Sequence, residues 1–301
     1  MKQAIIFCLL VATSASAQVA RVFLAGTGND AGDCTNQATP CRSLQGAVTA
    51  CPVNGEIIIL DNGGYGGATI TKSLTVNASA GIVAFIARTI TVNIGTTDKV
   101  VLRGLSMNGV VFGDPNGILF SGGGTLVVEN SVIAGFTTAV GTSIGINQTA
   151  AGSNLIVNNC ELRNNDSGLV NGTGSTTNSN TVIENSRFEY NAADALLVGA
   201  STASVSVRNS VFANNFEGIN ASSSVNAKPV LVVVDTCTID HNSFGLTAGN
   251  AGSAIIRVTD STIDHNSTGM FIVGGTIESY GNNRVLANTN GSTFSGTVAL
   301  Q

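Results

Sequence analysis

The sequence predicts an all-β fold, a single-stranded parallel β-helix in which the chain winds through about ten coils. A unit of about 26 residues repeats along the chain, and the same residue types return at the same place in each unit. The segments between the repeated strands have turn residues and no helical periodicity. Hairpins of a β-sandwich, the alternative fold, would not reproduce residue types in phase over six units.

Residues 1–17 are expected to form a secretory signal peptide that is cleaved after Ala17. Lys2 precedes an apolar run, and the segment closes on the small residues Ala15, Ser16 and Ala17. No other apolar run approaches the roughly 20 residues that a membrane helix needs. The mature protein is therefore expected to be secreted, extracellular or periplasmic, with no membrane span.

Residues 18–55 are expected to form an N-terminal cap. Cys34 and Cys41 lie in a stretch rich in Gly, Asn, Asp and Thr that packs little core, so a disulfide between them is expected in an oxidising compartment. The pairing of Cys51 stays open. A zinc site at these three cysteines lacks a fourth ligand, because no His precedes His241.

The parallel β-helix is expected over residues 56–301. Apolar side chains stand three residues before each repeat anchor and, in all but one unit, five before it, which is the period-2 burial of a strand. A further apolar residue follows two positions after each anchor. The anchors are Ser131, Cys160, Ser186, Ser210, Cys237 and Ser261.

Polar residues repeat in phase with the anchors. Asn stands directly before four of them, Asn returns five residues after, and Gly recurs eight residues after. Both residue types accept left-handed backbone, so they mark corners, and stacked corners predict an Asn ladder. Cys160 and Cys237 share a phase three coils apart, roughly 14 Å, which predicts two buried thiols and no disulfide between them. The predicted ladder consists of Asn165, Asn191, Asn215, Asn242 and Asn266.

Both ends of the chain resemble exported bacterial right-handed β-helix proteins of the pectin-lyase-like superfamily. The resemblance implies a right-handed helix, a bacterial source and a short helix at Ser43 to Val48 that caps the first coil. It is carried by GTGND at 26–30, PCRSLQ at 40–45, GYG at 64–66 and SYGNNR at 279–284.

This superfamily includes pectate lyases, polygalacturonases, epimerases and adhesins, so the resemblance leaves open whether the chain is an enzyme. The Gly-His-Gly stretch of polygalacturonases is absent. The stretch Ile239 to Asn242 matches part of the Trp-Ile-Asp-His run of pectate lyases, but the chain has no Trp.

Two Asp-His pairs, Asp240 with His241 and Asp264 with His265, are the candidate catalytic residues. Their spacing of 24 residues is one coil, so equivalent side chains are expected to stack. Two carboxylates about 5 Å apart can bind a divalent cation or divide into acid and base. Calcium is the candidate cofactor, with Asp240 and Asp264 as its candidate ligands.

Earlier coils place Arg163, Glu189 and Tyr190 near the same column, and these are the candidate ligand-binding residues. The alternative is a solvated turn that tolerates many residues, since the equivalent positions in other units hold Ala134 with Gly135. Duplication of a coil would copy an Asp-His pair without selection for chemistry.

The balance of 13 Lys and Arg against 18 Asp and Glu gives a net charge of −5. The cations are scattered singly, which argues against nucleic acid as a partner. The leading hypothesis is a secreted or cell-surface β-helix that contacts polysaccharide or cell-surface glycan, or acts as a surface scaffold, without catalysis. The alternative is a polysaccharide lyase or glycoside hydrolase that uses the Asp-His pairs.

Overall fold

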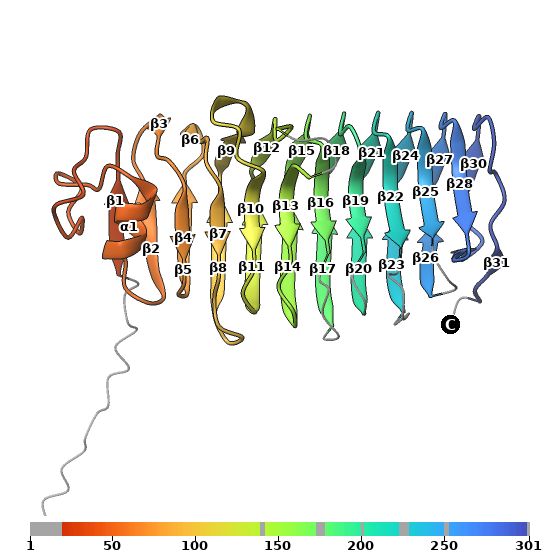
Figure 1. The fold of residues 1–301 in the computed structure, drawn as a ribbon, viewed down its shortest axis with the longest axis horizontal. Helices are drawn as coiled ribbons and strands as arrows, with labels where there is room; N and C mark the ends of the chain where they lie inside the picture. The colour runs from red at the N-terminus through yellow and green to blue at the C-terminus, as the bar shows by residue number, and fades with distance from the viewer. Residues whose placement is uncertain are drawn as a thin grey trace, which may run out of the picture.

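The structure, a computed structural model, describes residues 20–138, 142–172, 178–199, 202–222, 229–249 and 253–299. The expected signal peptide, residues 1–17, lies outside these ranges. The described chain is a parallel β-helix in which three long sheets run along the molecule (Figure 1). Neighbouring strands within each sheet pair in parallel, one coil upon the next.

The three sheets differ in how many strands they contain. The twelve-stranded sheet consists of β1 (Arg21–Leu24), β2 (Gly55–Ile59), β5 (Leu74–Ala78), β8 (Lys99–Arg103), β11 (Gly124–Glu129), β14 (Ser153–Asn158), β17 (Ser179–Glu184), β20 (Ala203–Arg208), β23 (Val230–Asp235), β26 (Ala254–Thr259), β29 (Thr276–Ser279) and β31 (Gly296–Thr297). The ten-stranded sheet consists of β3 (Gly63–Gly64), β6 (Ala84–Ile86), β9 (Leu105–Asn108), β12 (Val132–Ala134), β15 (Glu161–Arg163), β18 (Arg187–Glu189), β21 (Val211–Ala213), β24 (Thr238–Asp240), β27 (Thr262–Asp264) and β30 (Arg284–Leu286). The nine-stranded sheet consists of β4 (Ala68–Ile70), β7 (Ile90–Val92), β10 (Asn116–Phe120), β13 (Ile144–Gln148), β16 (Ser167–Asn171), β19 (Asp194–Val198), β22 (Glu217–Ser222), β25 (Phe244–Gly249) and β28 (Thr268–Val273).

The nine-stranded sheet limits the number of complete coils in the described chain to nine, from β2 to β4 up to β26 to β28. The first and last turns of the chain add strands to the other sheets only. The predicted count of about ten is therefore slightly too high.

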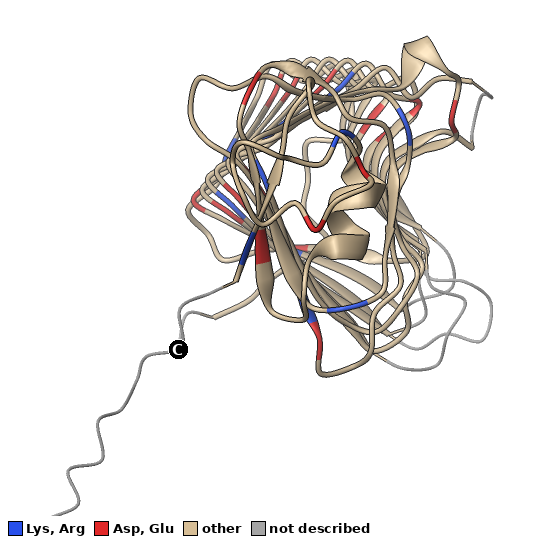
Figure 2. Ribbon diagram, turned by 90° about the vertical axis from the view of Figure 1, so that its left-hand side faces the viewer, with Lys and Arg blue, Asp and Glu red and all other residues tan. Residues whose placement is uncertain are grey.

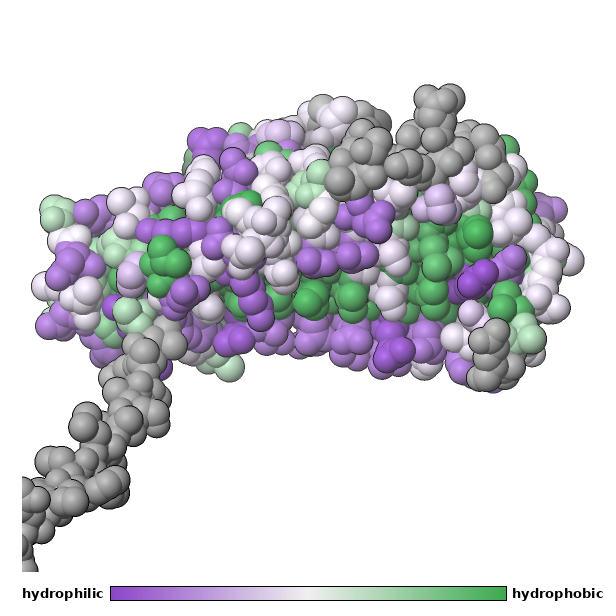
Figure 3. All heavy atoms as spheres, turned by 90° about the horizontal axis from the view of Figure 1, so that it is seen from below, coloured by the Kyte–Doolittle hydropathy of each residue, from purple (hydrophilic) through white to green (hydrophobic). Residues whose placement is uncertain are grey.

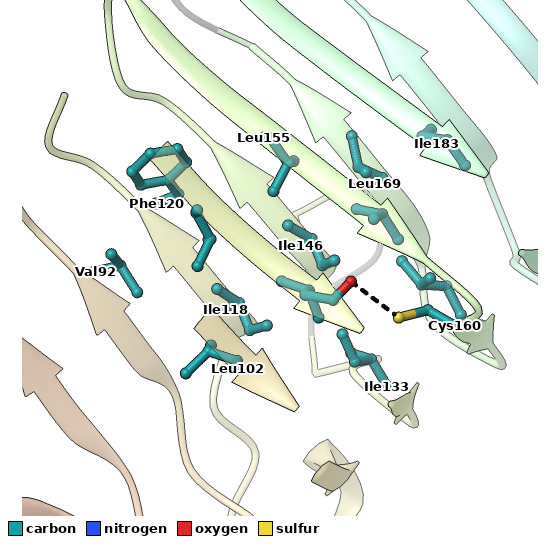
Figure 4. Close-up of a cluster of buried hydrophobic side chains, with 14 of the residues drawn as sticks. Val92, Leu102, Ile118, Phe120, Ile133, Ile146, Leu155, Cys160, Leu169 and Ile183 are labelled. Atoms are coloured by element: carbon teal, nitrogen blue, oxygen red, sulfur yellow. Dashed lines mark hydrogen bonds between the residues drawn. The ribbon is translucent and has the colours of Figure 1, made fainter. Parts of the chain in front are cut away.

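The core is a column of apolar side chains that point inward from all three sheets. In β11, Leu126 and Val128 are fully buried while Val127 between them faces outward. Figure 4 shows such inward side chains on neighbouring coils. Residues two after each anchor are fully buried, and the rings of Phe188 and Phe212 stack with centroids 4.8 Å apart. The predicted period-2 burial is confirmed.

Two kinds of corner join the sheets. The residues before the anchors adopt left-handed backbone, with φ from 47° at Asp260 to 52° at Asn130 and 55° at Thr236. On the five coils that contain β15, β18, β21, β24 and β27, the buried Asn side chains that follow these strands form a continuous ladder. Asn191 Oδ1 accepts from the backbone N–H of Asn165, and Asn191 Nδ2 donates to the carbonyl of Leu162. The predicted ladder is confirmed.

Helix α1 (Leu44–Ala50) lies at the N-terminal end of the β-helix. Ser43 caps it, since its Oγ accepts from the backbone N–H of Gly46 at 3.0 Å. The helix packs against β4 and β1, and Gln45 Oε1 accepts from the N–H of Thr69, so α1 covers the first edge of the nine-stranded sheet (Figure 2). It ends two residues beyond the expected segment, Ser43 to Val48, and covers that edge rather than the whole first coil.

The expected disulfide between Cys34 and Cys41 is present. It closes a loop that follows β1. Both ends of this loop are also hydrogen-bonded to β1: the carbonyl of Cys34 accepts from the N–H of Phe23, and the N–H of Cys41 donates to the carbonyl of Phe23. Cys51, Cys160 and Cys237 are free and buried. Within the described ranges no helix has the length and hydropathy that a membrane span requires.

Candidate functional site

The two Asp-His pairs lie at the corner between the ten-stranded and nine-stranded sheets. Asp240 ends β24 and Asp264 ends β27, and the two residues are register partners. His241 and His265 follow with φ of 53° and 52°. This turn position is left-handed on several coils, and other residue types occupy it: Gly135, Asn164, Tyr190 and Asn214.

The structure brings all four side chains together. The imidazole rings of His241 and His265 stack with centroids 5.1 Å apart and planes 4° from parallel. His241 Nδ1 lies 3.4 Å from Asp240 Oδ2, and His265 Nδ1 lies 3.3 Å from Asp264 Oδ2. Each carboxylate is therefore oriented toward the imidazole that follows it in the chain, and the predicted stacking of equivalent side chains is present.

The pairs lie on an open turn. The side chains of His241 and His265 are 56% and 52% exposed. Among the described residues, no group of three or more His, Cys, Asp and Glu side chains is placed to hold one metal ion. The catalytic roles of the four residues, and calcium at Asp240 and Asp264, stay predictions.

The candidate ligand-binding residues form a strip whose charges are already paired. Arg163 makes an ion pair with Glu161 on β15, and Arg187 makes one with Glu189 on β18. In register, Arg163 faces Glu189, but Ala213 stands between Glu189 and Asp240, which interrupts the column.

Tyr190 projects from the same corner as the imidazoles. Its side chain is exposed, and its backbone is left-handed with φ of 56°. Asn214 is the equivalent residue on the next coil, between Tyr190 and His241. The corner thus presents one phenol, one amide and two imidazoles on successive coils.

Sequence reasoning missed an aromatic row on the outer face of the nine-stranded sheet. The rings of Phe216 and Phe244 meet edge to face with centroids 5.6 Å apart, and those of Phe244 and Phe271 lie 5.1 Å apart. Phe216 and Phe271 are exposed. The three residues stand at different offsets from their anchors, so a search for residues in phase does not connect them.

An acidic row accompanies these rings. Asp194 opens β19 and Glu217 opens β22, and the two are register partners. Asp166 lies one coil earlier, and its carbonyl accepts from the N–H of Ala193 at 2.7 Å. Unequal turn lengths hid this row too, since these residues follow their anchors by six, eight and seven positions.

Burial and mutual repulsion raise the pKa values of two carboxylates in this row. Burial raises the pKa of Asp194, and neighbouring Asp166 raises it further, against a hydrogen bond from Asn220 Nδ2 at 2.9 Å. Burial also raises the pKa of Glu217, and Asp194 adds to that shift. No strand of the nine-stranded sheet contains Lys or Arg, so this sheet supplies no cation to the carboxylates.

The outer face of the twelve-stranded sheet has a different chemistry. An apolar stripe crosses neighbouring strands there and is visible in Figure 3 beside a polar row. A hollow of about 310 Å³ opens near its C-terminal part, with Leu231 and Ile255 in its lining. Arginines on this face are paired with acids of the next coil, as in Arg103 with Glu129 and Arg208 with Asp235. The stripe includes Val101, Val127, Ile156 and Val182.

Residues 56–231 match the family model described as a right-handed β-helix region. No curated protein matches the chain. A crystal structure of pectate lyase Pel9A is similar at 14% identity and a TM-score of 0.55, covering 94% of this chain and 79% of that one. A crystal structure of pectin methylesterase from Aspergillus niger, penultimately deglycosylated, is similar at 12% identity and a TM-score of 0.51, covering 95% and 92%. At these identities the likeness shows the fold.

Proposed function

The chain belongs to the family of proteins with a right-handed β-helix region, and from that premise we propose that it is a secreted or cell-surface protein that binds a neutral polysaccharide without cleaving it. The observation that carries the proposal is the aromatic row of Phe216, Phe244 and Phe271. Exposed aromatic rings beside hydrogen-bonding side chains provide the apolar surface and the polar groups that a ligand site combines.

The geometry suits an extended ligand. The aromatic row crosses three successive coils, and strands in a sheet lie about 4.8 Å apart, so the row continues along the helix axis. Asn220 and Thr268 lie on the same sheet, and Tyr190, His241 and His265 line the adjacent corner. A polymer of sugars that follows the axis would meet rings and hydrogen-bonding groups on each coil.

The charge of this surface favours a neutral polymer. The nine-stranded sheet contributes Asp194 and Glu217 and neither Lys nor Arg. A polyanionic glycan would face like charges here, and the arginines of the other two faces are largely engaged in ion pairs. Binding to a polyuronate through this face is therefore disfavoured.

Two further observations support export and a glycan ligand. The disulfide between Cys34 and Cys41 is typical of proteins from oxidising compartments. The similar structures are a pectate lyase and a pectin methylesterase, whose names refer to polysaccharide substrates. The likeness in fold makes polysaccharide the first ligand class to test.

The experiment that tests the proposal is isothermal titration of the purified mature protein with soluble neutral glucans, mannans and galactans, and with polygalacturonate. The double variant Phe216→Ala/Phe271→Ala should bind the neutral ligand at least tenfold more weakly, about 1.4 kcal/mol. Phe112→Ala is the matched control, since Phe112 is exposed to 56% and Phe216 to 49%, but Phe112 lies far along the helix axis.

Binding of polygalacturonate alone, or equal loss in the Phe112→Ala control, would overturn the proposed face. Absence of saturable heat with every polymer would overturn polysaccharide binding itself. The protein variants are compared by circular dichroism, so that a folding defect is not counted as lost binding.

The second candidate function, a polysaccharide lyase or glycoside hydrolase, is favoured by one observation, the contact of each Asp carboxylate with an imidazole. A reducing-end assay over the same polymers, with and without calcium, separates the two functions, because lyases and hydrolases both create new chain ends. Release that disappears in His241→Asn/His265→Asn would favour the enzyme, and no release is the outcome expected here.

A further inference from the structure

The proposed function leaves the apolar stripe on the twelve-stranded sheet unused. Outward side chains of a sheet that faces water are usually polar. Here one register row crosses the six successive strands β8, β11, β14, β17, β20 and β23, and five of its six residues are aliphatic and partly exposed (Figure 3). A contiguous apolar surface of this kind marks an interface with another molecule. The row consists of Val101, Val127, Ile156, Val182, Ser206 and Val233.

A charged row runs beside the stripe, two residues further along each strand. In the order of the coils it consists of Arg103, Glu129, Asn158, Glu184, Arg208 and Asp235. Within the chain, Arg103 makes an ion pair with Glu129, and Arg208 makes one with Asp235. The charges at the two ends of the row have opposite signs, and so do the charges one position inward from each end. The row is therefore complementary in charge to a copy of itself that runs in the reverse direction.

A twofold axis parallel to the strands produces this reversal. In a twofold interface the same patch lies on both copies, so each contact occurs twice. With the axis along the strands, the order of the coils reverses and each row lies opposite its own copy. Arg103 then faces Asp235 of the second copy. Glu129 faces Arg208 of the second copy, and the apolar stripe meets the apolar stripe.

The other twofold axis in the plane of the face, along the β-helix, is unfavourable. It would place the charged row against the row on the opposite side of the stripe, coil on coil. Two cations, Lys99 and Arg103, would then face each other, and Leu231 would face the carboxylate of Asp235. With the axis along the strands, this third row meets its own copy without like charges. Its contacts are Lys99 with Leu231, Thr125 with Ser204 and Asn154 with Asn180.

The size of the face suits a dimer that dissociates on dilution. Six strands that lie about 4.8 Å apart, with outward residues over about 20 Å of each strand, cover roughly 550 Å² per copy and about 1,100 Å² for the pair. This area is at the lower end for specific interfaces. The axis along the strands also keeps the strands of the two sheets aligned, which lets the sheets pack about 10 Å apart with interdigitating side chains.

We propose that the protein forms a dimer with a second copy of itself, in which the twelve-stranded sheets pack face to face and the two β-helices run in opposite directions. The apolar stripes form the centre of the interface. The charged rows form one edge, where each cation at the ends of the row meets a carboxylate of the second copy. Dimerisation is independent of polysaccharide binding, because the aromatic row lies on the nine-stranded sheet, outside this interface.

Sedimentation equilibrium of the purified mature protein between about 1 and 500 μM tests the dimer. Wild type should change from monomer to dimer over this range. Ile156→Lys places a charge at the centre of the stripe and should raise the dimer Kd at least tenfold. Val170→Lys is the matched control and should dimerise as wild type does, since Val170 is also aliphatic and partly exposed but lies on β16 of the nine-stranded sheet. Circular dichroism verifies that both variants are folded.

Three results would contradict the proposal. Monomer at every concentration of wild type would overturn the dimer. A dimer that Ile156→Lys leaves unchanged, or that Val170→Lys weakens equally, would overturn the assignment to this face.

A charge exchange tests the arrangement of the two copies. Glu129→Arg places a cation opposite Arg208 of the second copy and should raise the dimer Kd at least tenfold. Glu129→Arg/Arg208→Glu restores opposite charges across the interface and should return the Kd to within about threefold of wild type. The pairs with Arg103 and Asp235 within each chain are lost in monomer and dimer alike, so their loss cancels from the Kd. A double variant that dimerises no better than Glu129→Arg would overturn the antiparallel arrangement.

Discussion

The imidazole of His241 lies flat on that of His265, with ring centroids 5.1 Å apart. The spacing is that of two neighbouring strands, because both residues occupy the same left-handed turn position on successive coils. The repeat alone therefore accounts for the stacking of the two rings. Its side chains stand in solvent and leave the core beneath them unchanged.

Replacing both imidazoles by amides should leave the stability of the fold intact. Asn favours left-handed backbone and already occupies this turn position at Asn164 and Asn214. The free energy of unfolding of His241→Asn/His265→Asn in urea is expected within about 0.5 kcal/mol of wild type. His241→Ala is the contrast, since Ala disfavours positive φ and should lose about 1 kcal/mol. A larger loss in the Asn variant would show that the imidazoles support the fold.

The Asn ladder should be far less tolerant. Asn215 Oδ1 accepts from the backbone N–H and side-chain amide of Asn191, and Asn215 Nδ2 donates to the carbonyl of Phe188. Asn215→Ala leaves these buried groups unpaired, and the free energy of unfolding should fall by about 3 kcal/mol. Asn180→Ala, on an exposed strand position with one side-chain bond to Asn154, should change it by less than about 1 kcal/mol. Equal losses would contradict a structural role for the ladder.

The sequence was sufficient for those parts of the fold that depend on exact repetition. Equivalent anchors and ladder residues must stack in a β-helix, so their period predicts both the strands and the corners, as at Ser186 and Asn191. The aromatic and acidic rows bring neighbouring side chains together in space, but their members are out of phase in the chain, because turn lengths differ between coils. Phe216, which precedes β22, and Phe244, which opens β25, therefore share no sequence position that a period could detect.

Thr236 is the least suitable residue at the corner before an anchor. Its φ of 55° is left-handed, which a β-branched side chain disfavours, whereas four other coils have Asn in this position. Thr236→Asn should therefore raise the free energy of unfolding by about 0.5 to 1 kcal/mol. The hydrogen bond of its hydroxyl to Asp235 is exposed and offsets little of this gain.

The reciprocal change provides the control for this corner. Asn209→Thr places a β-branched residue at φ 49° and should lower the free energy of unfolding by a similar amount. Thermal unfolding of both variants measures the two changes in stability. A destabilised Thr236→Asn would mean that the Thr side chain contributes a contact that outweighs its backbone strain.

The acidic row should make the protein less stable as pH rises. Burial, and then Asp194, raise the pKa of Glu217 above its ordinary value. The folded chain therefore binds this proton more tightly than the unfolded chain does, so stability is highest below the unfolded pKa and falls as pH rises through the folded pKa. Asp194 behaves in the same way, with burial and Asp166 as its causes. The nine-stranded sheet has no Lys or Arg to oppose either group.

Glu217→Gln isolates this contribution, because Gln keeps the shape of the side chain and carries no charge at any pH. Measured by urea unfolding, the stability of Glu217→Gln relative to wild type should rise between pH 4 and pH 7.5. Glu189→Gln, at an ion-paired carboxylate on the neighbouring sheet, should show no such rise. A difference that stays constant, or that shrinks as pH rises, would mean that the folded chain does not hold the proton of Glu217 more tightly than the unfolded chain does.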